Sequence, residues 1–265
     1  MTYQLNHVKI SRQGHLVLDD LCLTLQSGRV IGLIGPNGAG KSTLLAALAG
    51  DLKVDQGQIE MDGQAFKSLS PEQLAKRRSI LTQQATAIFN LTVRQVLELG
   101  LYAFEHWPRP DRESLLADVA KLTHICEWLH QSITTLSLGQ QQRVHFARTL
   151  VQAKACLKER GNAWWLLDEP TASQDPRQQQ MMMSVCRAFA NQSSSGVLLV
   201  MHDLSLAAQW CDEIIVLKNK GLLAHGKTRD VLTADTLRQV YGSELDVKVF
   251  WDPLIGVIMS STKAH

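Results

Sequence analysis

Residues 35–42 form a glycine-rich loop, Gly-Pro-Asn-Gly-Ala-Gly-Lys-Ser, that fits the pattern GxxxxGK[ST] in full. An apolar run (30–34) precedes the loop and a helical pattern (42–49) follows it, which is the setting that a phosphate-binding loop requires. Such a loop surrounds phosphates with backbone N–H groups, and the helix N-terminus adds partial positive charge. A plain glycine-rich turn is the alternative, but the context favours ATP binding by Gly35, Pro36, Asn37, Gly38, Ala39, Gly40, Lys41, Ser42 and Thr43.

Two acids end the apolar run at residues 164–167, where the sequence reads Trp-Trp-Leu-Leu-Asp-Glu. A buried strand would hold Asp168 at its carboxyl end, where the carboxylate can bind Mg²⁺ together with the Ser42 hydroxyl. Glu169 would then lie where it can polarise an attacking water. Acids at a strand end are common, so alone the pair is weaker evidence for this chemistry. Together with a complete phosphate-binding loop it becomes strong evidence.

Residues 136–143, Leu-Ser-Leu-Gly-Gln-Gln-Gln-Arg, place a small hydroxyl residue and a glycine at the start of another predicted helix. Taken alone, Ser137 would be a helix cap. The segment resembles the LSGGQ signature of ABC ATPases, and the resemblance extends over residues 5–241. It implies that Ser137, Gly139 and Gln140 contact ATP bound to a second copy of the chain. The sequence departs from the family at Leu138, where Gly is usual.

Further family motifs follow in order along the chain. Gln83 matches the glutamine that contacts Mg²⁺ and the attacking water, although the adjacent Gln84 leaves the register open. Asp175 matches the D-loop aspartate, within Ala-Ser-Gln-Asp where the family has Ser-Ala-Leu-Asp. His202, after the apolar run 197–201, matches the histidine that contacts the γ-phosphate. The aromatic residue that stacks on adenine is missing, and we expect Arg12 or His15 in its place.

The elements that must position these residues alternate between strand and helix. Strand-like runs occur at 5–10, 21–25, 30–34, 164–167, 197–201 and 214–217, and helical patterns at 93–99, 114–129 and 140–153, with a loop at 107–110. This order predicts an α/β fold with a parallel sheet. With the resemblance, we expect a P-loop NTPase (RecA-like) parallel-sheet core, an N-terminal antiparallel β subdomain and a helical insertion.

We expect residues 1–265 to form one ABC ATPase domain. Residues 1–90 and 154–242 would be the nucleotide-binding core with the β subdomain, 91–153 the helical subdomain, and 243–265 a C-terminal extension.

Composition limits the alternatives. The chain has 265 residues, 45% of them hydrophobic and 20% charged, with a net charge of +2, which is too small to indicate nucleic-acid binding. Its apolar runs are too short to cross a bilayer and it begins without a signal-peptide pattern, so we expect a cytosolic chain with reduced cysteines. Membrane association would then come through a partner, at the cytoplasmic face of the inner membrane.

The resemblance also implies partners and cargo. Two copies would bind head to tail and act on two transmembrane permease subunits, with a periplasmic or surface substrate-binding protein engaged indirectly. The chain is most similar to ATPases of iron-complex, hemin and cobalamin importers. We expect hemin import, because of the connection at 154–163 and the tail at 226–242; ferric siderophore or cobalamin import is the alternative. A non-transport ABC ATPase would need a long coiled coil or a second cassette, and an inactive regulatory module would be expected to lack Lys41, Glu169 or His202.

Overall fold

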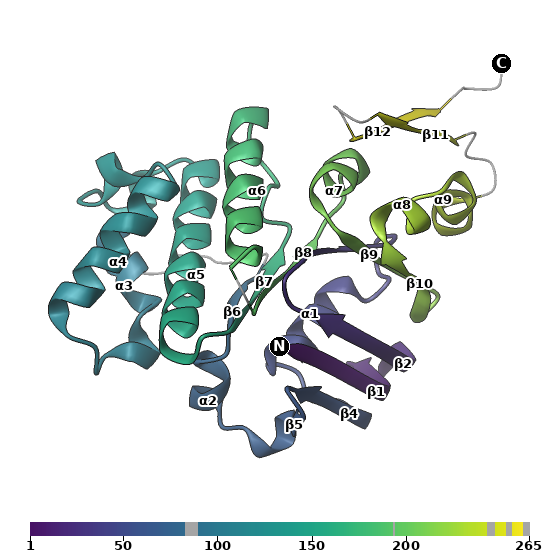
Figure 1. Ribbon diagram of the computed structural model, residues 1–265, viewed down its shortest axis with the longest axis horizontal. Coiled ribbons are helices and arrows are strands. Elements are labelled where there is room, and N and C mark those ends of the chain that lie inside the picture. The colour runs from purple at the N-terminus through teal and green to yellow at the C-terminus, as the bar shows by residue number, and fades with distance from the viewer. Residues whose placement is uncertain (83–89, 193, 243–246, 253–255, 262–265) are drawn as a thin grey trace.

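A computed structural model describes residues 1–82, 90–192, 194–242, 247–252 and 256–261 (Figure 1). Its centre is a six-stranded sheet in the order β10-β9-β3-β8-β7-β6. The strands are β3 (Val30–Ile34), β6 (Arg78–Leu81), β7 (Ala163–Asp168), β8 (Ser195–Val200), β9 (Glu213–Lys218) and β10 (Gly221–Lys227). All neighbours are parallel except β10, which runs antiparallel to β9. Strands β3, β7 and β8 are buried along their whole length, as expected for parallel strands covered on both faces.

The register of this sheet aligns the ends of its strands. Val200 of β8 pairs with Leu33 of β3 on one side and with Asp168 of β7 on the other. Carboxyl ends of parallel strands meet at one edge of a sheet, which is where ligands bind in open α/β folds. The phosphate-binding loop, the two acids and His202 therefore leave the sheet at the same edge.

A second sheet is antiparallel, with the order β2-β1-β4-β5. It comprises β1 (Thr2–Arg12), β2 (His15–Gln26), β4 (Gln56–Met61) and β5 (Gln64–Ala65), and is followed by η1 (Phe66–Ser68) and α2 (Pro71–Ala75). Helix α1 (Lys41–Ala49) contributes to the same hydrophobic cluster as this sheet. The expected N-terminal antiparallel β subdomain is confirmed.

A helical layer covers the other face of the central sheet. It contains α3 (Val93–Leu99), η2 (Tyr102–Phe104), α4 (Arg109–Leu122), η3 (Cys126–Trp128), η4 (Ile133–Thr135) and α5 (Leu138–Arg160). Several boundaries in this layer differ from expectation. The helix expected over 114–129 ends at Leu122 as α4, and η3 follows it as a separate turn. Helix α4 begins earlier, because Pro110 lies in its first turn, where no N–H partner is needed. Helix α5 continues through most of the expected connection at 154–163 and ends at Arg160, with Gly161 as its C-cap.

The chain finishes with four helices that belong to the same hydrophobic cluster as α5, and with a hairpin. Helices α6 (Pro176–Ala190), α7 (Leu204–Trp210), α8 (Thr228–Val231) and α9 (Ala234–Tyr241) precede β11 (Val247–Asp252) and β12 (Gly256–Ser261), which pair with each other. Together these layers confirm the expected fold class. Among the described residues, no helix has both the length and the apolarity needed to cross a bilayer.

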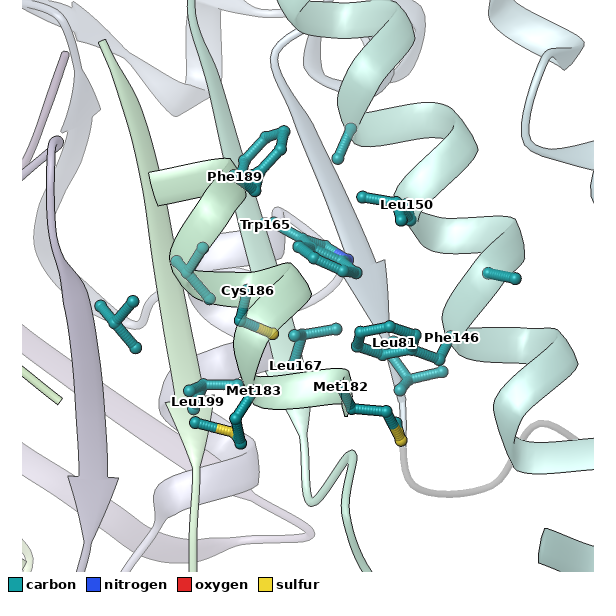
Figure 2. Packing of buried hydrophobic residues seen from close by; sticks show 14 of the residues in the cluster. Leu81, Phe146, Leu150, Trp165, Leu167, Met182, Met183, Cys186, Phe189 and Leu199 are labelled. Carbon is teal, nitrogen blue, oxygen red and sulfur yellow. The ribbon is translucent and has the colours of Figure 1, made fainter. Parts of the chain in front are cut away.

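Two adjacent tryptophans of β7 join the layers on either face of the sheet. Trp165 packs between Phe146 of α5 and Phe189 of α6, with ring centroids 4.8 and 5.5 Å away (Figure 2). Trp164 points the other way and lies 5.0 Å from the ring of Tyr3 in β1. The strand that ends in Asp168 is thus fixed from both sides.

Candidate functional site

The phosphate-binding loop lies between β3 and α1. Gly35 has φ of 149°, and a Cβ there would lie 2.3 Å from the carbonyl oxygen of Leu217, so only glycine fits. Within the loop, Lys41 Nζ donates to the carbonyl oxygens of Gly35 (2.9 Å) and Pro36 (3.1 Å). The loop therefore holds the lysine ammonium beside its own backbone, at the N-terminus of α1.

Asp168 ends β7 as a buried carboxylate. Its Oδ1 atom has no hydrogen-bond partner among the described residues. Burial raises the pKa of Asp168, and a hydrogen bond from the Ser42 hydroxyl opposes that rise. A buried carboxylate with an open oxygen beside a hydroxyl is suited to a divalent cation, which prefers oxygen ligands. Ser42 and Asp168, from the sequence-predicted metal set, thus come together.

Glu169 and His202 are joined across the strand ends. His202 Nε2 lies 2.7 Å from Glu169 Oε1. Glu169 has φ of 49°, a left-handed conformation that costs about 1–3 kcal/mol for a residue with a Cβ and is characteristic of functional sites. Its backbone N–H donates to the carbonyl oxygen of Val200 at 3.2 Å, which ties it to β8.

One cavity of 640 Å³ brings these groups together. It is lined by Val17, Asn37, Gly38, Gly40, Lys41, Ser42, Thr43, Glu169 and His202. Burial lowers the pKa of Lys41, while the nearby Glu169 and Asp168 carboxylates act in the opposite sense. The cavity therefore has a cation, phosphate-binding N–H groups and a carboxylate–imidazole pair facing one space.

The residues expected to contact adenine are not among those that line this cavity. Arg12 and His15 do not line the cavity, whereas Val17 of β2 does. A single β-branched residue in a strand carries no chemical signal in the sequence, so Val17 could be found only from the packing of β2 beside the loop.

The signature residues lie at the start of α5. Ser137 is the N-cap, and its hydroxyl accepts from the Gln140 N–H at 3.3 Å while the Gln140 side chain accepts from the Ser137 N–H at 2.8 Å. These residues do not line the cavity just described. Leu138 is 81% exposed, so the departure from the family lies on the surface.

A pair of glutamines links this turn to Glu169. Gln174 Nε2 donates to the carbonyl oxygen of Gly139 (2.9 Å) and to Gln142 Oε1 (3.3 Å). Gln142 Nε2 in turn donates to the carbonyl oxygen of Glu169 (3.1 Å). Sequence reasoning did not single out either side chain, because only the packing of α5 on residues 169–175 brings them together.

Asp175 and Gln83 are the remaining predicted site residues. Asp175 is the N-cap of α6 and accepts from the Gln178 N–H at 2.9 Å. Gln83, with its neighbour Gln84, lies outside the described residues, so its predicted contact with Mg²⁺ stays a prediction.

Comparisons with known proteins agree with this architecture. A family model described as "ABC transporter" matches residues 18–172. The hemin import ATP-binding protein HmuV of Bordetella pertussis is 40% identical over 247 residues, covering 93% of this chain and 94% of the relative. The protein of that name from Enterobacter cloacae is 36% identical, covering 92% of each chain.

Solved structures support the fold. The ATP-binding subunit of an ABC transporter superposes with a TM-score of 0.78 at 21% identity, covering 91% of this chain and 98% of that one. A putative metal-chelate type ABC transporter in an inward-facing conformation gives 0.77 at 19% identity, covering 100% of this chain and 98% of that one. By its sequence and its fold, the chain belongs to the ABC transporter family, as an ATP-binding subunit.

Proposed function

We propose that this chain hydrolyses ATP to power a hemin importer, acting as a homodimer on two membrane permease subunits. The observation that carries the ATPase part is the single cavity in which Lys41, Glu169 and His202 face the phosphate-binding loop. The high identity to hemin import ATP-binding proteins over nearly the whole chain supports the cargo.

The loop would bind the phosphates first. Its backbone N–H groups, from Asn37 to Thr43, and the N-terminus of α1 favour the anion. Lys41 would exchange its contacts with the Gly35 and Pro36 carbonyls for the β- and γ-phosphate oxygens. Ser42 and Asp168, with Gln83 as a further candidate, would hold Mg²⁺, which neutralises charge on the phosphates.

Hydrolysis would depend on the pair at the strand ends. Glu169 accepts a hydrogen bond from the attacking water and orients it in line with the γ-phosphate. His202 Nε2 lies 2.7 Å from Glu169 Oε1. In the same cavity, it would also contact the γ-phosphate. The left-handed backbone at Glu169 aims its side chain into the cavity, so positioning supplies much of the catalysis.

A second copy would complete the site. Ser137, Gly139 and Gln140 form a helix N-terminus that lies away from the chain's own phosphate-binding cavity. In a head-to-tail dimer, this terminus would contact the γ-phosphate of ATP held by the other copy, and Asp175 would lie at the same junction. Closure on ATP and opening after hydrolysis would then move the permease. The dimer would reside at the cytoplasmic face of the membrane.

Growth on hemin tests the cargo and the motor together. We would delete the gene, supply hemin as the sole iron source, and complement with wild type or Glu169→Gln. Rescue by wild type alone is expected. Normal growth of the deletion strain on hemin, in a host without a second hemin system, would contradict hemin import; a defect on a ferric siderophore or on cobalamin would then identify the alternative cargo.

A further inference from the structure

Two β-bulges face each other in the N-terminal sheet. Leu5 pairs with Leu23 and Val8 with Leu21, so two residues of β1 oppose only Cys22 of β2. One step further, Val8 pairs with Leu21 and Ile10 with Leu18, so two residues of β2 oppose one of β1. Bulges re-aim side chains and often accompany sites of function.

Both bulges contain a residue in a left-handed conformation. His7 in β1 and Asp20 in β2 each have φ of 49°. This region is unfavourable for residues with a Cβ, and glycine would be the default there. Histidine and aspartate enter this region more readily than most residues with a Cβ, so the two bulges can hold these side chains beside Cys22.

The bulges bring three metal-ligating side chains to one place. His7 Nδ1 lies 2.6 Å from Asp20 Oδ1, and the His7 backbone N–H donates to Cys22 Sγ at 3.3 Å. The imidazole nitrogen, carboxylate oxygen and thiol sulfur all lie within 4.8 Å of one another. Ligand atoms around a tetrahedral Zn²⁺ are about 3.3–3.8 Å apart, so small side-chain rotations would complete the geometry.

We propose that His7, Asp20 and Cys22 form a binding site for a borderline-soft transition-metal ion such as Zn²⁺. One nitrogen, one oxygen and one sulfur ligand suit Zn²⁺ and disfavour Mg²⁺, which requires hard oxygen ligands. The thiol proton and any proton shared by His7 and Asp20 would leave to solvent on binding. The three residues are exposed, which leaves the fourth position open to water.

This site is separate from the ATP site. None of its three residues lines the phosphate-binding cavity. Cys22 instead lines a second cavity of 660 Å³, together with Asn6, Arg29, Glu213 and His225. An ion bound here would cross-link β1 and β2 without touching the nucleotide, so its binding does not depend on the proposed function.

Zinc titration of the untagged, reduced, nucleotide-free protein tests the proposal. An excess of Mg²⁺ occupies oxygen-ligand sites, and a coloured chelator competes for Zn²⁺. We expect one Zn²⁺ per chain, with affinity at least about tenfold weaker in Cys22→Ser and in His7→Ala. Substituting Co²⁺ for Zn²⁺ should give a thiolate-to-cobalt absorption band that Cys22→Ser abolishes.

Cys126→Ser is the matched control, because Cys126 is also an exposed free cysteine but lies in the helical layer. It should retain both the zinc affinity and the cobalt band. Unchanged affinity in Cys22→Ser, or a wild-type protein with no site tighter than about 10 µM, would overturn the proposal. His7 and Asp20 would then be an ordinary exposed ion pair, which stabilises little.

Discussion

Glu169 occupies a position set by its neighbours on both sides of the chain. Asp168 before it is the last residue of a fully buried strand, and Pro170 follows it. The backbone N–H of Glu169 bonds to β8 and its carbonyl oxygen accepts from Gln142, so the left-handed conformation is held by two separate contacts. Adjacent acids thereby acquire different surroundings, one buried beside Ser42 and one facing the cavity.

Replacing Glu169 by Gln should leave ATP binding intact and abolish most hydrolysis. The amide keeps the shape and a hydrogen bond to His202, but it cannot accept a proton from water. We expect turnover to fall at least about 100-fold. Single-turnover hydrolysis and nucleotide binding would be measured side by side, with the exposed Glu72→Gln as control. Turnover near the wild-type rate would remove Glu169 from the catalytic role.

Asp168→Asn should stabilise the nucleotide-free protein while impairing hydrolysis. Burial raises the pKa of Asp168 above its ordinary 3.8, so between these two values the folded chain binds more protons than the unfolded chain. Stability therefore falls as the pH rises through that interval. The variant lacks this loss, so its advantage in the free energy of unfolding should grow with pH and then level off once the folded-state carboxyl is fully ionised.

Thermal unfolding without nucleotide or Mg²⁺, from about pH 4 to pH 8, measures this difference. The exposed Asp118→Asn serves as the control, since it removes the same charge without altering burial. An advantage of Asp168→Asn that stays the same at every pH would contradict the role of the buried carboxylate.

At this scale the sequence predicted most of the residues that meet in the cavity. The loop from Gly35 to Ser42 is a contiguous motif, and Glu169 follows a strand whose burial its apolar residues make clear. Val17 escaped prediction, because its place depends on how β2 packs beside the loop. Arg12 and His15 do not line this cavity, and their expected contact with adenine stays a prediction.

The elements are coupled through their side chains as well as through the sheet. Trp165 anchors α5 to β7, and its indole N–H donates to the Thr149 hydroxyl at 3.0 Å. At the start of α5, Gln142 and Gln174 bond the signature turn to residues 169–175. A movement of the turn would therefore displace the backbone of Glu169.

Gln174→Met should lower kcat with little change in the KM for ATP. Methionine has a similar length but no donor, so the bonds to Gly139 and Gln142 are lost while the phosphate-binding loop is untouched. Neutral hydrogen bonds contribute about 1 kcal/mol each, so the loss of these two should lower kcat by up to about 30-fold. Steady-state ATPase kinetics would separate kcat from KM.

Gln180→Met is the matched control, since Gln180 lies on α6 with an exposed side chain and contacts Gln209 instead. Gln180→Met should have the kcat and the KM for ATP of the wild type. Hydrogen exchange of residues 169–175 gives a reading independent of ATPase activity, and it should speed up only in Gln174→Met. Equal exchange in the two variants would show that Gln174 does not hold this segment.

The ends of the helices were predicted less well than the strands. Four of the parallel strands (β3, β7, β8 and β9) were identified from their apolar runs, but β6 was not. The end of α5 at Arg160 was missed, because only Ala155 and Cys156 are buried in its last turns. Pro110 indicated a break, yet it occupies the first turn of α4, where proline is tolerated. Capping and tertiary packing, rather than local propensity, fixed both ends.

At the scale of the whole molecule, the phosphate-binding cavity and the signature turn, which we propose are two halves of one ATP site, do not meet within one chain. The phosphate-binding cavity is lined by Val17 of β2, by the loop and the start of α1, and by Glu169 and His202, while Ser137 caps α5 outside that lining. The exposed Leu138 at this turn places an apolar side chain where a second copy would approach. If two copies join head to tail, each complete site takes one half from each chain.

Mixing two inactive variants tests this arrangement directly. Lys41→Ala removes the phosphate contact and Ser137→Arg blocks the signature turn, so each variant alone should be inactive. In a mixed dimer, the intact loop of the Ser137→Arg chain faces the intact signature of the Lys41→Ala chain, which restores one site. Random pairing makes about half of the dimers mixed, so activity should return to at most about a quarter of wild type. ATPase assays over a range of mixing ratios, with Lys41→Ala plus Lys41→Ala,Ser137→Arg as the control mixture, would measure it. No recovery from two folded, dimerising variants would mean that each chain completes its site alone.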